Sequence, residues 1–315
     1  MLSLLALYPM VYQGAMSLTD FSAGSIRDGL NGGVWREVRE GLTGRAEPVE
    51  VELAFSRPST KEVRWAGPGL FFQILGGAGA PLVVFEIIWT SLAVALQTGL
   101  GLGVALLLNR PGLRFANIWR ALFVLPWAIP EFVGALIWAQ ILEPRFGWLN
   151  LAGESFATRL DAPIALNLVA RWQEDPVVAL VVLLIAATWY GFPFMMLAAS
   201  AGLKLVPKEV YDAAAIDGAG RWQTLRRITW PLLFPLLVPA IIIRAIFTFN
   251  QFYLFYVLNT PFPATTLSLA SFFFFSEGGM YAVSAAINLS TVVVLIGLVI
   301  WFDRRSRAAE GVTYA

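Results

Sequence analysis

The stretch YDAAAIDGAG, residues 211–220, lies between two of the longest apolar runs of the chain, yet it carries two aspartates and little bulky hydrophobic surface. Pro207 is well placed for a first helical turn, and Gly218 and Gly220 suit a helix stop. We therefore predict a short helix of about 10 residues within residues 205–220. Its consecutive alanines would let another backbone approach closely, as in a helix that docks into a groove.

The composition of the chain is that of a membrane protein. Of its 315 residues, 58% are hydrophobic and 14% are charged, which lies outside the range of globular domains. The net charge of +1 offers no field for nucleic acid. The absence of cysteine and histidine excludes disulfides, thiolate nucleophiles, Cys/His zinc sites and the commonest general base. We expect one non-catalytic transmembrane domain over residues 1–315.

Apolar stretches of about 20 residues are long enough to cross a ~30 Å hydrocarbon core. Three carry no charge, namely residues 87–108, 177–203 and 282–302. Two carry one charge each, namely residues 121–142 with Glu131 and residues 228–258 with Arg244. The N-terminal run 1–18 is taken as a sixth span, with a cleaved signal peptide as the alternative. The sequence thus predicts an all-α polytopic protein with about six transmembrane helices.

Shorter features interrupt this pattern. LSLASFFFF, residues 267–275, is too short to span and is interpreted as interfacial or re-entrant. Prolines within the spans predict either simple kinks or the broken helices that line transporter pathways; they are Pro126, Pro130, Pro193, Pro231, Pro235 and Pro239.

The distribution of Lys and Arg predicts the orientation, because basic residues near span ends stay cytoplasmic. Basic residues exceed acidic ones in residues 109–120, 204–227 and 303–307, and acidic residues exceed basic ones in residues 19–86 and 143–176. Both termini are therefore expected in the cytoplasm. The segment 19–86 is then extracytoplasmic, and its piece VEVELAF alternates like a short strand.

The connection after the fourth predicted span carries a spaced motif. Asp212, Ala213 and Ala214 are followed after three residues by Gly218, and after nine more by Ile228 and Pro231. This spacing resembles the signature of the permease subunits of ATP-binding-cassette importers, which is EAA, three residues, G, nine residues, I-x-L-P. Asp212 and Trp230 depart from the usual glutamate and leucine. A polar helix formed through propensity alone is the alternative.

Other pieces resemble the sugar branch of that family, in particular its maltose-type permease. They are TWYGFPFMM, FTFNQFYLFYVL, YPMVYQGAMSLTDFS and RFGWLN. The resemblance implies a type I importer permease fold and sugar import by alternating access. It also implies a second, distinct permease, two ATPase subunits and an extracytoplasmic binding protein as partners. ATP and Mg²⁺ would bind to the ATPase, and this chain has no GxxxxGK[ST] motif of its own.

The resemblance also suggests site residues. The surface that couples to the ATPase would comprise Asp212, Ala213, Ala214, Ala215, Asp217 and Gly218. The substrate residues would be Gly191, Phe194, Asn250 and Gln251. An aromatic face stacks on a pyranose, glycine leaves room for the ring, and amides donate to and accept from hydroxyls. The alternative is that Phe194 packs between helices and that Asn250 bonds a neighbouring helix.

The two charges within predicted spans, Glu131 and Arg244, are costly in a bilayer and are therefore candidates for function. Each lies at a similar depth, about 20 Å from the cytoplasmic side. We expect them to neutralise each other or to face one aqueous cavity, with two separately hydrated charges as the alternative. Rival functions are an importer permease for a non-sugar solute, an ion-coupled secondary transporter using Glu131, and an assembly factor without transport.

Overall fold

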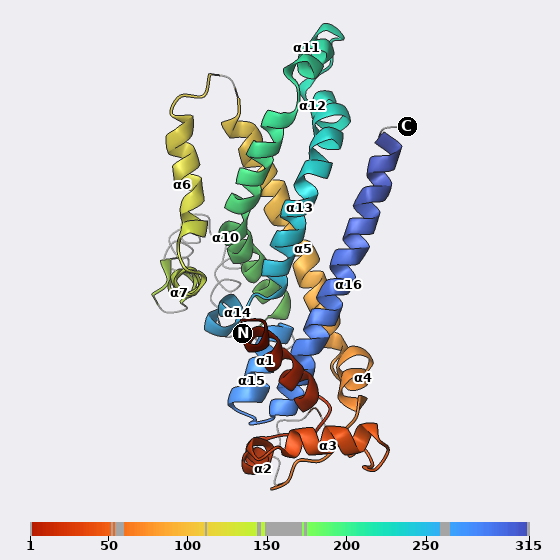
Figure 1. The fold of residues 1–315 in the computed structure, drawn as a ribbon. Coiled ribbons are helices and arrows are strands. Elements are labelled where there is room, and N and C mark those ends of the chain that lie inside the picture. The colour runs from red at the N-terminus through yellow and green to blue at the C-terminus, as the bar shows by residue number, and fades with distance from the viewer. Residues whose placement is uncertain are drawn as a thin grey trace. The chain divides into compact units, whose positions relative to one another are not determined.

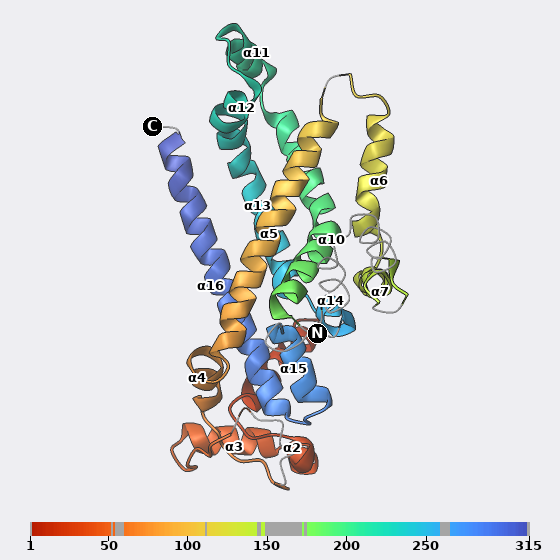
Figure 2. The same ribbon diagram turned by 180° about the vertical axis from the view of Figure 1, so that it is seen from behind.

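The computed structural model describes residues 2–51, 53, 60–110, 112–143, 146–148, 172, 175–258 and 265–313. Its described part is helical, as Figures 1 and 2 show from opposite sides, and an isolated bridge joins Thr19 to Trp65. The strand expected from VEVELAF is not formed by its described residues 49–51 and 53. The all-α prediction is confirmed.

The chain divides into two compact units. The first combines Met1–Ile87 with Thr265–Gly297, so it joins the N-terminal part of the sequence to a segment from its last third. Besides the ends of two longer helices, this unit contains α1 (Leu2–Met16), η1 (Ala23–Ser25), α2 (Ile26–Leu30), α3 (Gly33–Leu42), α4 (Gly69–Gly76) and α15 (Leu267–Ser276). The described part of the expected extracytoplasmic segment 19–86 therefore contains these short helices and the start of a longer one.

The second unit combines Ile88–Ala264 with Leu298–Ala315. Two long helices, α5 (Ala80–Leu108) and α16 (Tyr281–Thr313), run through both units. The remaining helices in the described part of the second unit are α6 (Ala116–Ala128), α7 (Glu131–Ile141), α10 (Pro176–Leu205), α11 (Lys208–Ile216), α12 (Arg221–Thr224), the π-helical η2 (Leu225–Thr229), α13 (Trp230–Phe249) and α14 (Tyr253–Leu258).

Four described helices are long and apolar enough to cross a membrane, or five spans result if α6 and α7 count as one. The four are Ala80–Leu108, Pro176–Leu205, Arg221–Leu258 and Tyr281–Phe302, which contain four of the predicted spans. The expected N-terminal span forms α1, a helix of only 15 residues. At 1.5 Å per residue it is shorter than the ~30 Å hydrocarbon core. The described part therefore has fewer spanning helices than the six predicted.

The predicted span 121–142 is not one straight helix, because α6 and α7 meet at an angle of 94°. Pro130 lies at the bend, and the residue before it, Ile129, has extended backbone angles of φ −87° and ψ 147°. A proline disfavours the helical region for its predecessor and cannot donate a backbone hydrogen bond. The helix therefore breaks here, and Glu131 becomes the first residue of α7.

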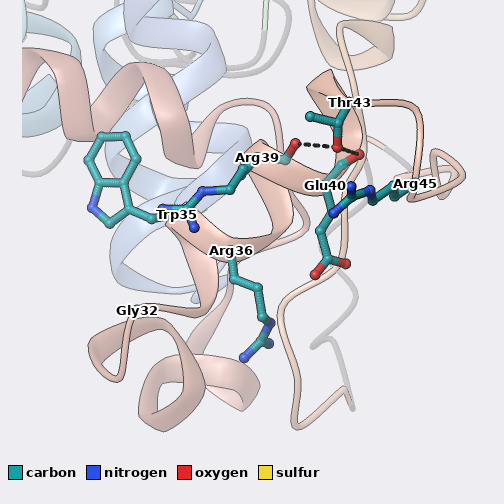
Figure 3. Close-up of a pocket in the computed structure, with 7 residues that line it drawn as sticks. All are labelled: Gly32, Trp35, Arg36, Arg39, Glu40, Thr43 and Arg45. Carbon is teal, nitrogen blue, oxygen red and sulfur yellow. Dashed lines mark hydrogen bonds between the residues drawn. The ribbon is translucent and has the colours of Figure 1, made fainter.

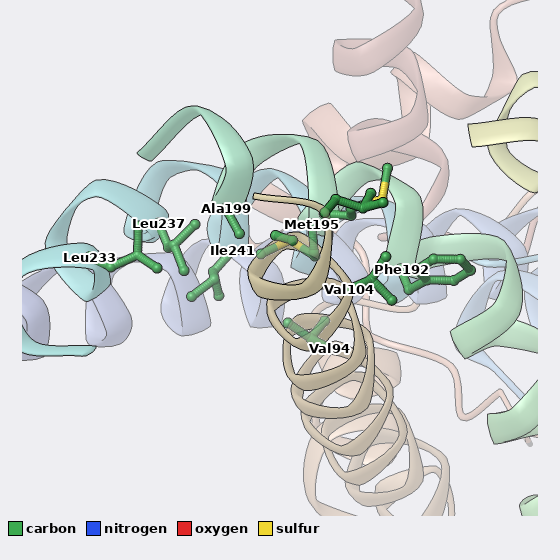
Figure 4. Close-up of a cluster of buried hydrophobic side chains, with 11 residues drawn as sticks. Val94, Val104, Phe192, Met195, Ala199, Leu233, Leu237 and Ile241 are labelled. Carbon is green, nitrogen blue, oxygen red and sulfur yellow. The ribbon is translucent and has the colours of Figure 1, made fainter. Parts of the chain in front are cut away.

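Helices α5, α10 and α13 share an apolar core in the second unit, which Figure 4 shows in close-up. Gly101 of α5 permits a close approach of α10, since a Cβ there would lie 2.7 Å from the Met195 Cβ and from the Met196 backbone nitrogen. Truncating a large buried side chain in such a core costs about 2–5 kcal/mol. The labelled members of the core are Val94, Val104, Phe192, Met195, Ala199, Leu233, Leu237 and Ile241.

The piece predicted as interfacial or re-entrant forms α15, whose 10 residues are too few to span a bilayer. Two backbone N–H groups of its first turn donate to side-chain oxygens. Leu267 N–H donates to Glu86 Oε2 at 2.7 Å, and Leu269 N–H donates to Thr266 Oγ1 at 3.3 Å. The Ser271 and Ser284 hydroxyls, 2.8 Å apart, then join α15 to α16 within the first unit.

Candidate functional site

The short helix predicted within residues 205–220 is α11, with nine residues. Pro207 directly precedes it, and Gly218 follows its end in a left-handed conformation with φ 71°. Gly218 N–H donates to the Ala215 carbonyl at 3.2 Å, and Ala219 N–H donates to the Ala214 carbonyl at 2.9 Å. These two bonds form a Schellman motif, which favours glycine at the left-handed position. The predicted start at Pro207 and stop at Gly218 are therefore confirmed, whereas Gly220 precedes α12 and does not end α11.

Most of the predicted coupling surface is open. Of its members, Asp212, Ala213, Ala215, Asp217 and Gly218 are exposed, whereas Ala214 faces inward and is 6% exposed. Large apolar side chains around α11 are also exposed, namely Leu205 (69%), Ile216 (88%) and Trp222 (71%). Small residues next to exposed apolar ones suit close contact with another protein. These three residues were not predicted from the sequence, although apolar side chains in a polar loop were a usable signal.

A buried polar cluster joins α5, α10 and α13. Arg244 Nε donates to Gln97 Oε1 at 2.6 Å, and Gln97 Nε2 donates to the Ala187 carbonyl at 3.0 Å. Thr248 Oγ1 lies 3.5 Å from the same Gln97 oxygen. Gln97 is fully buried and Arg244 is 4% exposed. Gln97 was missed by the sequence analysis, although an amide within the apolar stretch 87–108 was visible.

Gly191 lies one turn after Ala187 on α10, beside this cluster. A Cβ at Gly191 would lie 2.7 Å from both Gln97 Nε2 and Gln97 Oε1, which is closer than real Cβ atoms approach. The space next to this glycine is therefore occupied by the Gln97 amide in this structure. Its predicted role, to leave room for a sugar ring, stays a prediction.

Glu131 lies at the start of α7, at the break in the span. The Gln251 side chain hydrogen-bonds the Glu131 carboxylate, and Glu131 attracts the Arg244 guanidinium through space. Among the described residues, however, no ion pair within 4.0 Å joins Glu131 to Arg244. The two charges thus belong to one polar region without direct contact. Tyr190 donates to the Ile129 carbonyl at 3.3 Å and so supports the same break.

The other predicted substrate residues have different surroundings. Phe194 is partly buried, and its ring lies 5.8 Å from that of Trp127. Asn250 is exposed and its amide donates to the Ile246 carbonyl of its own helix at 2.9 Å, so it does not make the bond to a neighbouring helix considered above. Gln251 is 3% exposed. The structure therefore brings Gln251 close to Glu131 and leaves Asn250 at the surface of the chain.

The first unit contains a second polar feature, a cavity of about 410 Å³ beside α3 (Figure 3). It is lined by Gly32, Trp35, Arg36, Arg39, Glu40, Thr43 and Arg45. Near it, Asp28 accepts hydrogen bonds from the Val63 backbone N–H and from Arg36, both at 3.0 Å. The Val63 N–H, and after it the Arg36 side chain, lower the pKa of Asp28 although partial burial raises it.

Curated relatives of the chain are sugar permeases by their names. The galactooligosaccharides transport system permease protein GanP of Bacillus subtilis is 29% identical over 268 residues, covering 81% of this chain and 62% of GanP. The trehalose/maltose transport system permease protein MalF of Thermococcus litoralis is 33% identical over 218 residues, covering 68% of this chain and 70% of that protein. The chain thus spans about three fifths of the length of GanP.

Solved structures show the same fold. A bacterial ABC transporter involved in the import of the acidic polysaccharide alginate matches with a TM-score of 0.64 at 18% identity, covering 78% of this chain and 84% of that one. The model of one family, described as the binding-protein-dependent transport system inner membrane component, matches residues 97–308. This match covers more than half of the chain and includes the polar cluster and α11. The chain therefore belongs to the family of binding-protein-dependent transport system inner membrane components.

Proposed function

We propose that the chain is the transmembrane permease subunit of an ATP-driven, binding-protein-dependent importer and forms half of its translocation pathway. The observation that carries this proposal is α11, a short helix with a Schellman end, exposed small residues and an exposed apolar side chain at Ile216. Such a helix supports docking onto a partner, and it lies within the family match. The partner would be an ATPase subunit that binds ATP and Mg²⁺.

The long helices on either side of α11 support a route for coupling. Helix α10 leads into α11 and carries Ala187, whereas α13 follows α12 and η2 and carries Arg244. Both residues contact the buried Gln97 through Ala187 O and Arg244 Nε. Closure of the ATPase pair on ATP binding would move α11, and α10 and α13 would carry that movement to the polar cluster. The ATPase would bind the two conformations of the alternating-access cycle with different affinities. This difference would shift the equilibrium between them.

The complete importer would contain a second, distinct permease, two ATPase subunits and an extracytoplasmic substrate-binding protein. It would lie in the cell inner membrane, with both termini of this chain in the cytoplasm, as the distribution of Lys and Arg predicts. The cytoplasmic side would then include α11, and the extracytoplasmic side would include the segment 19–86.

The proposed substrate is a mono-, di- or oligosaccharide. Support comes from the relatives, whose names refer to galactooligosaccharides, maltodextrin, trehalose and maltose. Side-chain amides, a guanidinium and a carboxylate in one region also suit hydroxyl groups, to which they can donate or from which they can accept. A permease for a non-sugar solute is the alternative, followed by an ion-coupled secondary transporter that uses Glu131.

Purification of the chain with its partners tests the proposal. We expect an ATPase to copurify, and we expect maltotriose or galactobiose with the binding protein to stimulate ATP hydrolysis by the reconstituted complex. Stimulation by an amino acid instead of a sugar would support the first alternative. Uptake that continues after inactivation of the ATPase and follows an ion gradient would support the secondary transporter and contradict the proposal.

A further inference from the structure

We propose that Gln97 is a positioning residue for Arg244, which it holds facing Glu131 across the polar cluster, and that Gly191 is glycine because Gln97 occupies the adjacent space. The inference rests on the proposed function only in placing this cluster in the translocation pathway. The contacts themselves lie within the second unit.

Both ends of the Gln97 amide are used, which fixes its orientation. Its oxygen accepts from Arg244 Nε at 2.6 Å, and its nitrogen donates to the Ala187 carbonyl at 3.0 Å. Turning the amide over would place its NH₂ group against the guanidinium and its oxygen against the carbonyl, so both contacts would become repulsive. The Ala187 carbonyl of α10 therefore fixes the orientation of the Gln97 amide on α5. That amide in turn fixes the position of the Arg244 guanidinium on α13.

Gly191 completes this arrangement because it has no side chain. A Cβ at this position would lie 2.7 Å from the Gln97 nitrogen and oxygen. An alanine would therefore push the amide away from the Ala187 carbonyl or from Arg244. Since α10 approaches α5 this closely, neither helix backbone offers an easy adjustment. Gly191 thus acts through Gln97 on Arg244.

As a consequence, the Nε side of the Arg244 guanidinium is held by Gln97, and its opposite end is available to donate to another group. Within the described part of the chain, Gln97 is the hydrogen-bond partner of Arg244, and it accepts from the Nε donor. Glu131 Oε1 is buried and has no hydrogen-bond partner there. The two groups attract each other without an ion pair within 4.0 Å. Both groups suit a neutral polyhydroxylated solute, because one hydroxyl can accept from the guanidinium and another can donate to the carboxylate.

The absence of cysteine from the chain permits a test that needs no solute. In the assembled complex, Glu131→Cys is labelled with an anionic reagent, 2-sulfonatoethyl methanethiosulfonate, and with a cationic one, 2-aminoethyl methanethiosulfonate. Arg244 held towards position 131 should favour the anionic reagent. We expect Gln97→Ala or Gly191→Ala to lower the anionic-to-cationic rate ratio about fivefold. The two substitutions together should lower it no further, because they act on the same contact.

Two matched controls use residues without such contacts. Gln140→Ala replaces an exposed glutamine of α7, and Gly99→Ala fills open space on α5, with no atom within 4 Å of the new Cβ. Neither should change the labelling ratio. If Gln97→Ala does not assemble, Gln97→Asn, which keeps the amide on a shorter side chain, replaces it. A ratio unchanged by the Gln97 substitutions, or no labelling at position 131 by either reagent, overturns the inference.

A second measurement uses the chain with native Glu131. If maltotriose or galactobiose stimulates ATP hydrolysis, Gln97→Asn should raise the half-saturating sugar concentration about tenfold while the maximal rate changes less than twofold. An equal half-saturating concentration overturns the inference, since a positioning residue must affect solute recognition. If no sugar stimulates the wild-type complex, the proposed sugar import fails, and the labelling ratio still decides whether Gln97 positions Arg244.

Discussion

Arg244 and Gln97, 147 positions apart in the sequence, are joined by a 2.6 Å hydrogen bond from Nε to Oε1. The glutamine satisfies the buried guanidinium without neutralising it, because an amide carries no charge. The compensating charge in the described region is Glu131, which acts on Arg244 through space. Gln97 thus supplies the hydrogen bond to Arg244, whereas Glu131 supplies the compensating charge. The two contributions can therefore be tested by different substitutions.

Replacing Gln97 with leucine should lower the stability of the assembled complex. A hydrogen bond to a charged group contributes about 1.5–3 kcal/mol, and the buried guanidinium would lose its partner. The expected result is a lower Tm of the purified complex, with Gln140→Leu on the exposed side of α7 as the control. Adding Arg244→Met together with Glu131→Gln to Gln97→Leu should recover part of the loss, because the guanidinium without its hydrogen-bond partner and the carboxylate that compensates its charge are removed together. A triple variant less stable than Gln97→Leu would contradict this account.

The parts of the fold that the sequence predicted depend on local signals. Long uncharged runs define α5, α10 and α16, and a proline and a glycine define the ends of α11. Pro130 was recognised as a possible break, yet its 94° angle depends on how α6 and α7 pack and not on the proline alone. The N-terminal run was predicted as a span because hydropathy reports composition, whereas the helix it forms has 15 residues.

The site was less predictable because its contacts are distant in sequence. The spacing around Asp212 placed the exposed helix, but nothing local to Gln97 indicated that it would meet both Ala187 and Arg244. Gly191 illustrates the same limit. A glycine in a span signals close approach, but only the tertiary structure shows that the approaching group is the Gln97 amide.

Gly218 should be sensitive to any side chain, although there is open space around it. Its φ of 71° is unfavourable for residues with a Cβ by about 1–2 kcal/mol, and no atom lies within 4 Å of an added Cβ. Gly218→Ala should therefore weaken the end of α11 and lower solute-stimulated ATP hydrolysis without preventing membrane insertion. Gly218→Asn should be milder, since asparagine tolerates this conformation better.

Gly220 provides the matched control for this prediction. It lies two residues further on, also with no atom within 4 Å of an added Cβ, but its φ is −69°. Gly220→Ala should therefore leave solute-stimulated ATP hydrolysis unchanged. Equal effects of the two alanine substitutions would show that the left-handed turn after α11 does not matter for coupling.

The segment 19–86 should lose local stability in acid through Asp28. Its hydrogen bonds to Val63 N–H and Arg36 lower the pKa of the folded carboxyl below the ordinary value of about 3.9. The charged carboxylate therefore stabilises the fold above that value, and the contribution is lost as pH falls towards the lowered pKa. The protection factor of the Val63 amide in hydrogen exchange should fall over this range. Asp28→Asn should remove this pH dependence, and an unchanged profile would contradict the assignment.

The start of α15 should depend on Glu86, which is fully buried and accepts from Leu267 N–H at 2.7 Å. Glu86→Ala leaves that backbone donor buried without this acceptor, at a cost of about 1–3 kcal/mol. Glu86→Gln retains an acceptor oxygen at the same reach and should keep most of the stability. Thr266→Ala removes the neighbouring bond to Leu269 N–H and serves as the comparison for loss of a hydroxyl cap. Hydrogen exchange of the α15 amides should accelerate in Glu86→Ala more than in Glu86→Gln. Equal exchange in the two variants would mean that α15 is held by packing against α16, through contacts such as Ser271 with Ser284, and not by the carboxyl group.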